Sequence, residues 1–151
     1  AMLIRRATLS DIDLVAPQFD LYRQFYQQPP NPELARRFIT ERLERNESVI
    51  FLALDDESNP PRAAGFVQLY PLFSSTQARP MWLLNDLYVS ALYRRNGVGR
   101  RLMETAKEHA IGTGACVIEL VTAANNRTAQ VLYEKIGYKR DEEFVRYELM
   151  L

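Results

Sequence analysis

Residues 84–103 read Leu84-Asn85-Asp86-Leu87-Tyr88-Val89-Ser90-Ala91-Leu92-Tyr93-Arg94-Arg95-Asn96-Gly97-Val98-Gly99-Arg100-Arg101-Leu102-Met103. This pattern predicts a strand, a short turn, a loop that holds glycines and arginines, and the first turns of a helix. A helix N-terminus presents unpaired backbone N–H groups and the positive end of the helix dipole. Glycines let the backbone approach a phosphate closely, and arginines attract it. The stretch therefore predicts a site for a phosphate-bearing ligand.

Apolar periodicity divides the remaining chain into short helices and strands. Strands are expected at 2–6, 48–54, 63–72, 81–90 and 117–121, followed by a closing pair at 138–140 and 143–150, with a loop at 71–80 between two strands. Helices are expected at about 12–22, 32–43, 97–111 and 127–136, and Pro17 is a point where the first can divide. This order predicts a single α/β domain over residues 1–151, in which about four helices flank a mixed, mainly antiparallel central sheet.

Composition narrows the classes of partner. The formal net charge is zero, so the whole-molecule field gives no attraction to nucleic acid or an anionic membrane. Cys116 is the only cysteine and His109 the only histidine, which leaves no pair for a disulfide and no zinc cluster. No apolar run approaches the length of a membrane span. We expect a cytoplasmic protein without a metal, with Cys116 in the core and His109 on a helix surface.

Two common phosphate motifs do not match the glycine loop. A P-loop requires a lysine followed by serine or threonine after its last glycine, and neither follows Gly97 or Gly99. A dinucleotide fingerprint requires a third glycine where Leu102 stands, and it normally opens a βαβ unit early in the chain. Both alternatives fail on the residues present.

A third pattern does match. Arg94-x-x-Gly97-x-Gly99 fits the Gln/Arg-x-x-Gly-x-Gly/Ala motif of the GNAT superfamily of acetyl-CoA-dependent N-acetyltransferases. The downstream run Asn126-x-x-Ala129-x-x-Leu132-Tyr133-Glu134-Lys135-x-Gly137-Tyr138 resembles a second signature of that family, with Tyr138 in place of phenylalanine. Asp86-Leu87-Tyr88-Val89 and the order of elements extend the resemblance over residues 2–151. The resemblance implies a GNAT-like fold, with a sheet that is splayed at the cofactor site.

The resemblance also implies where acetyl-CoA binds. The pyrophosphate would lie on the loop amides of Arg95 to Arg100, and the pantetheine arm would bond to main chain near Leu87 and Val89. Asn126 would be a further contact, although it is also a natural helix cap. The full set of implied cofactor contacts is Leu87, Tyr88, Val89, Arg94, Arg95, Asn96, Gly97, Val98, Gly99, Arg100, Asn126, Ala129 and Tyr133. Family members are usually homodimers, so a homodimer is expected, through the last strands.

Acetyl transfer to an amine needs a neutral amine, a stabilised oxyanion and a proton for the departing thiolate. Tyr133 matches the family's tyrosine acid, although a phenol with an ordinary pKa of about 10 depends on positioning for this role. Asp86 is the first candidate for the base, because a carboxylate is unusual in a buried strand. Glu119 and an ordered water are the alternatives.

The acceptor is predicted to be a small primary amine, such as a polyamine or a lysine-like compound. Phe73-Ser74-Ser75-Thr76 and the strand 84–89 look similar to the diamine and polyamine branch, which generally carries Glu-Asp where this chain has Asn85-Asp86. A protein or peptide N-acetyltransferase and a non-catalytic acyl-CoA sensor remain alternatives. The aromatic residues Tyr22, Tyr26, Tyr70 and Trp82 line an acceptor pocket or pack in the core.

Overall fold

The computed structural model describes residues 2–151, which form two units, residues 2–121 and Thr122–Leu151. The first unit contains β1 (Met2–Arg6), α1 (Ile12–Phe25), α2 (Pro32–Glu44), β2 (Val49–Asp55), β3 (Arg62–Ser74), β4 (Arg79–Val89), α3 (Val98–Gly112) and β5 (Ile118–Glu119), with single 3-10 turns at Leu9–Asp11 and Ala91–Tyr93. The second unit contains α4 (Arg127–Ile136). Each unit is described by itself.

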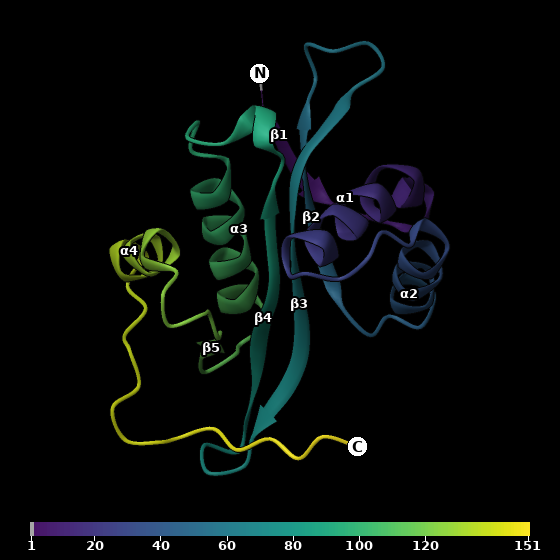
Figure 1. The fold of residues 1–151 in the computed structure, drawn as a ribbon. Helices are drawn as coiled ribbons and strands as arrows, with labels where there is room; N and C mark the ends of the chain where they lie inside the picture. Colours follow the sequence, from purple (N-terminus) through teal and green to yellow (C-terminus); the bar gives the residue numbers. More distant parts are fainter. Residues whose placement is uncertain (1) are drawn as a thin grey trace. The chain divides into compact units, whose positions relative to one another are not determined.

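The sheet of the first unit has the strand order β1-β2-β3-β4-β5. The first three pairs of neighbours are antiparallel and β5 pairs with β4 in parallel, which confirms the mixed, mainly antiparallel sheet. Helices α1 and α2 pack on one face of the sheet, and α3 packs on the other (Figure 1). The two faces therefore have separate cores and can carry separate chemistry.

The core between the sheet and the α1–α2 pair follows from sequence periodicity. Alternate residues of β2 face this core, and they meet residues at helical spacing on α1 and α2. The buried members include Val15, Phe19, Ala35, Ile39, Ile50, Leu52, Leu54 and Phe66. Asn31 caps α2 by accepting a hydrogen bond from the Leu34 N–H at 3.2 Å, as its position before Pro32 predicts. On the opposite face, α3 buries Val98, Leu102, Met103, Ala106 and Ala110.

The predicted loop at 71–80 is wrong, because β3 continues to Ser74 and β4 begins at Arg79. Both prolines lie inside strands. Pro71 of β3 is opposite Trp82 of β4. The Trp82 N–H donates to Val117 on the β5 side, so Pro71 and Trp82 form a non-hydrogen-bonded pair of the β3–β4 ladder, which requires no N–H from proline. The Pro80 carbonyl likewise accepts from Cys116 on the β5 side. Proline is tolerated here because its missing N–H faces away from the β3–β4 ladder.

Three further expectations at the ends of elements differ from the structure. Helix α1 continues through Pro17, because Val15 and Phe19 anchor the residues around it in the core. Strand β5 contains only Ile118 and Glu119, and it is partly exposed where a buried strand at 117–121 was expected. Residues 138–151 form no strand, so the predicted closing pair at 138–140 and 143–150 is wrong: the two segments do not form a ladder of backbone hydrogen bonds with each other.

Gly65 offers a test of the packing that holds β4 in place. A Cβ atom at this position would lie 2.5 Å from the Tyr88 carbonyl oxygen and 3.2 Å from the Val89 Cα. We expect Gly65→Ala to lower the free energy of unfolding by about 1–3 kcal/mol, because backbone cannot move aside cheaply. Gly112→Ala is the control, since nothing lies within 4 Å of its added methyl group. Urea unfolding of both variants is the measurement, and equal stability would contradict this packing.

Candidate active site

Strand β4 contains a β-bulge at Asn85. Gln68 of β3 is opposite Asp86, whereas the next residue, Leu69, is opposite Leu84. Asn85 is therefore one extra residue on β4. A bulge bends its strand and changes the direction of neighbouring side chains and backbone groups, and bulges are frequent beside active sites.

The bulge also determines which backbone groups face the edge of β4 toward β5. The Trp82 N–H donates to Val117 at 3.1 Å, whereas the Ser90 N–H donates to Ala64 of β3 at 2.8 Å. In a regular strand, the backbone N–H groups of residues an even number apart point to the same edge. Trp82 and Ser90 are an even number apart, but their N–H groups point to opposite edges of β4. The extra residue at Asn85 has therefore reversed the alternation. Leu87 and Val89 consequently present their backbone groups to an edge that β5 leaves uncovered, because β5 pairs only with Trp82 and Leu83.

Asp86 is the most deeply buried carboxylate on the α1 face of the sheet, with 2% of its surface exposed. One of its oxygens accepts a hydrogen bond from the Gln68 side-chain amide, and the other accepts from Asn85 Nδ2 at 2.8 Å. Gln68 in turn accepts from the Ser48 hydroxyl at 2.8 Å. Burial raises the pKa of Asp86, and the hydrogen bonds oppose this shift only in part. The carboxylate is therefore a stronger base than an exposed aspartate.

Two tyrosines lie around this carboxylate. The Tyr22 hydroxyl of α1 donates to the Asn85 carbonyl at 3.2 Å. Burial, followed by the negative charge of Asp86, raises the pKa of Tyr22 far above its ordinary value. The same two causes raise the pKa of Tyr70, so both phenols are neutral and can donate hydrogen bonds at any physiological pH. The chemistry of this group suits a cationic or hydrogen-bonding polar ligand.

The glycine loop after β4 adopts the backbone that its sequence predicts. Gly97 stands at the N-cap of α3 with φ of 77°, and Arg95 has φ of 66°. Gly97 has no side chain to cap the helix, and within residues 2–151 no other side chain is assigned as its cap. The first amides of α3 are thus available to an external acceptor, and the helix dipole favours an anion.

Hydrogen bonds hold the loop against the sheet. The Tyr93 hydroxyl donates to Asp55 of β2 at 2.7 Å, which lowers the pKa of that carboxyl. Arg94 Nε donates to the Val89 carbonyl at 2.9 Å, and its guanidinium lies 5.7 Å from the centre of the Tyr88 ring. Arg101 donates to the Met2 carbonyl at 2.9 Å. The start of α3 therefore has a fixed position relative to the end of β4.

The second unit contains the remaining residues of the predicted site, Asn126, Ala129 and Tyr133. The Asn126 side chain caps α4 by accepting from the Ala129 N–H at 3.3 Å, as its position predicts. Tyr133 lies on the same helix, with its ring centre 6.1 Å from that of Tyr138. Gly137 ends the helix in the left-handed conformation with φ of 117°. This helix has the N-cap and the C-terminal glycine that the sequence indicates.

Some expected site residues lie elsewhere. Trp82 faces the α3 side of the sheet, so it does not join Tyr22 and Tyr70. Glu119 is exposed and pairs in register with Leu83, which removes the reason for regarding it as a buried carboxylate. His109 is not at the helix surface but contacts Trp82 and Phe51. Cys116 is only partly buried.

Ser48 and Gln68 join the Asp86 site although neither was predicted as a site residue. Gln68 lies on an apolar strand two residues from Phe66 on the same face, and a polar residue there was the signal that could have identified it. Its pairing with Asp86 depends on the register of β3 and β4, which the sequence pattern alone left open.

Searches of residues 2–151 for two other kinds of feature give negative results. None of the helices in this part of the chain combines the length and apolarity that a membrane span requires. The same residues contain no group of three or more histidine, cysteine or acidic side chains placed to hold a metal ion.

Comparisons with known proteins identify the family of this chain. The model of the Acetyltransferase (GNAT) family matches residues 16–138. The uncharacterized N-acetyltransferase YhfO of Bacillus subtilis (strain 168) is 42% identical over 146 residues, which are 97% of this chain and 95% of that protein. The crystal structure of a probable acetyltransferase has a TM-score of 0.92 at 45% identity and covers 99% of this chain and 97% of its own.

A more distant crystal structure shares the fold. It is that of a predicted acetyltransferase with acetyl-CoA from Clostridium acetobutylicum, with a TM-score of 0.76 at 17% identity, and it covers 98% of this chain and 96% of its own. The family match spans most of the chain, and the similarity to YhfO spans nearly all of it. The chain therefore belongs to the GNAT family of acetyltransferases.

Proposed function

We propose that this acetyltransferase moves the acetyl group of acetyl-CoA to the primary amine of a small molecule. The observation that carries the proposal is the buried Asp86 carboxylate beside the bulge, next to a strand edge that β5 does not cover. A carboxylate among neutral phenols attracts an ammonium group and can accept its proton. The uncovered edge can bond an extended amide-containing arm as an added strand would.

The cofactor half of the proposal rests on the loop and the strand edge. The pyrophosphate would accept hydrogen bonds from the amides of Arg95 to Arg100 at the start of α3, where the dipole favours negative charge. The pantetheine amides would bond to the backbone of Leu87 and Val89. Family membership supports acetyl-CoA as the acetyl donor. Asn126 and Ala129 of α4 complete the proposed set of contacts.

The chemical step requires a base before attack and an acid after it. In our proposal Asp86 takes a proton from the ammonium group, directly or through a water, and the neutral amine nitrogen attacks the thioester carbonyl carbon. The new C–N bond forms, the C–S bond breaks, and the Tyr133 hydroxyl gives its proton to the departing thiolate. The second proton, which the amide nitrogen loses, returns to the Tyr133 oxygen through water. Acetyl-CoA supplies only the acetyl thioester and the thiolate leaving group.

Asp86, Tyr22 and Tyr70 support a small acceptor because the carboxylate is deeply buried. A small amine brings less bulk to a buried carboxylate than an amine that belongs to a peptide or protein chain does. The resemblance to the diamine and polyamine branch, the homodimer and the cytoplasmic location stay predictions of the sequence. Turnover measured over diamines, amino acids and peptides separates the small-amine proposal from the peptide alternative.

Replacement of Asp86 by asparagine should separate activity from stability. Asp86→Asn removes the base, and we expect kcat/KM to fall by about 10²–10⁴-fold. Glu119→Gln, which removes the alternative base, should retain activity. Steady-state kinetics with the best amine of the panel is the measurement, and full activity of Asp86→Asn would contradict the proposed role.

The same variant tests the raised pKa of Asp86 through the pH dependence of stability. The pKa of Asp86 is raised in the folded state, so above the unfolded value of about 4 the folded protein binds more protons and wild-type stability falls as pH rises. Asparagine has no such titration. The margin, which is the free energy of unfolding of Asp86→Asn minus that of wild type, should therefore rise from pH 4 to pH 7. A margin that is constant with pH would contradict the raised pKa.

Gly97→Ala tests the anion site, with Gly114→Ala as its matched control. Both glycines have φ near 75° and open space around the added methyl group, so each variant should lose on the order of 1 kcal/mol of stability. Only Gly97→Ala changes the loop that would hold the pyrophosphate. We expect its Kd for acetyl-CoA in calorimetry to rise at least about tenfold, while Gly114→Ala binds as wild type does.

Tyr133→Phe tests the proposed acid. Loss of the hydroxyl should lower kcat by about 10²-fold or more and leave the Kd for acetyl-CoA unchanged in calorimetry. Tyr138→Phe is the control, because it removes a hydroxyl from the neighbouring ring of the same unit. Undiminished turnover by Tyr133→Phe would assign proton delivery to another group.

A further inference from the structure

A second pocket includes Trp82 and His109, which belong to the α3 side of the sheet, whereas the Asp86 side chain is on the α1 side. It has a volume of about 290 Å³, near the lower limit of about 300 Å³ for typical small-molecule sites. Its lining comes from four strands, from the α2–β2 connection and from the end of α3, and comprises Arg6, Asn46, Ser48, Val49, Pro71, Trp82, His109 and Thr113. His109 is about three helical turns from the glycine loop at the start of α3.

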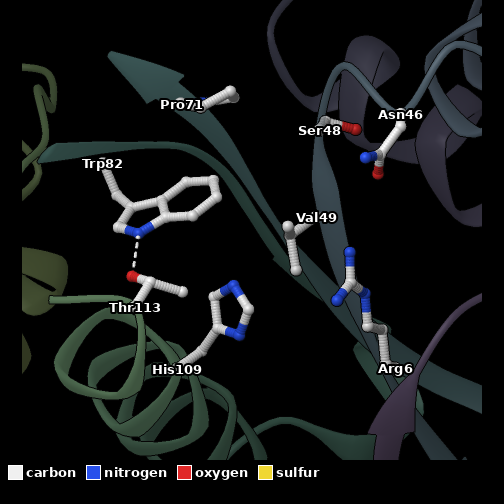
Figure 2. Close-up of a pocket in the computed structure, with 8 residues that line it drawn as sticks. All are labelled: Arg6, Asn46, Ser48, Val49, Pro71, Trp82, His109 and Thr113. Carbon is white, nitrogen blue, oxygen red and sulfur yellow. Dashed lines mark hydrogen bonds between the residues drawn. The ribbon is translucent and has the colours of Figure 1, made fainter. Parts of the chain in front are cut away.

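One wall of this pocket is aromatic and firmly held. The Trp82 indole N–H donates to the Thr113 hydroxyl at 2.9 Å. The His109 ring lies between Trp82, at 5.2 Å between ring centres, and Phe51, at 5.5 Å. These contacts fix the orientation of both rings before any ligand arrives, as Figure 2 shows for Trp82, Thr113 and His109.

The polar groups of the pocket suit an anion. His109 Nε2 is buried and has no hydrogen-bond partner within residues 2–151, which is costly unless a ligand or water satisfies it. Figure 2 shows the Arg6 guanidinium on the opposite side of the pocket from His109. Arg6 and His109 are the basic residues of the lining, which contains no acidic residue. Burial, and after it the positive charge of Arg6, lowers the pKa of His109, and a bound anion would offset both effects.

We propose that this pocket binds a small carboxylate with an apolar or aromatic body, at a site separate from that of acetyl-CoA. The carboxylate accepts hydrogen bonds from the Arg6 guanidinium and from an N–H at His109 Nε2. The body of the ligand packs on Trp82, Val49 and Pro71. A cation is excluded by the charge of Arg6, and a large anion is excluded by the volume of the pocket.

Trp82 is the only tryptophan in the chain, so its fluorescence reports directly on this pocket. We suggest titration of the full-length protein with phenylacetate, which does not absorb where tryptophan is excited, in the presence of saturating CoA. The expected result is a saturable change in emission with a Kd of about 1 mM or below. The uncharged analogue phenylacetamide should bind at least about tenfold more weakly.

Variants then assign the charge that is responsible. Arg6→Gln should weaken phenylacetate binding at least about tenfold, whereas Arg37→Gln, which removes an exposed arginine of α2, should leave it unchanged. The proposal is overturned if phenylacetate gives no saturable change, if CoA prevents its binding, or if Arg6→Gln binds equally well. Should Arg6→Gln fail to fold, equal affinities of wild type for phenylacetate and phenylacetamide overturn it.

Discussion

The one extra residue in β4 is the constraint on which this site depends. Without the bulge at Asn85, the backbone groups of Leu87 and Val89 would be used in the ladder with β3, and the edge toward β5 would present different residues. The bulge leaves Asp86 opposite Gln68 while it turns the next part of the strand to an open edge. One local irregularity thus provides both a buried carboxylate and an uncovered strand edge, a few residues before the glycine loop.

The buried carboxylate illustrates how a functional group is kept at the expense of stability. Removing Asp86 from water disfavours its charged form, and the hydrogen bonds from Gln68 and Asn85 compensate only partly, so its pKa is raised. The surrounding core of α1 and α2 supplies the stability that allows this charge to remain. A leucine at this position would pack more favourably but would have no base to offer.

The sequence predicted the glycine loop, the caps at Asn31 and Asn126 and most helix limits, because these depend on neighbours within one turn of chain. It was wrong about the loop at 71–80, since whether Pro71 and Pro80 are tolerated depends on which way each residue faces in a ladder. It was also wrong about strands at 138–140 and 143–150, because a strand requires a partner that local pattern does not reveal.

Local sequence was enough to indicate the family and the glycine loop, because glycine positions and helix caps follow from backbone requirements within a few residues. The burial of Asp86 with Gln68 and Ser48, the exposure of Glu119 and the packing of His109 against Trp82 follow from the folded chain alone. These facts depend on strand register and on which face each side chain occupies. A shift of one residue in register reverses every side chain, and the pattern of single residues does not specify that shift.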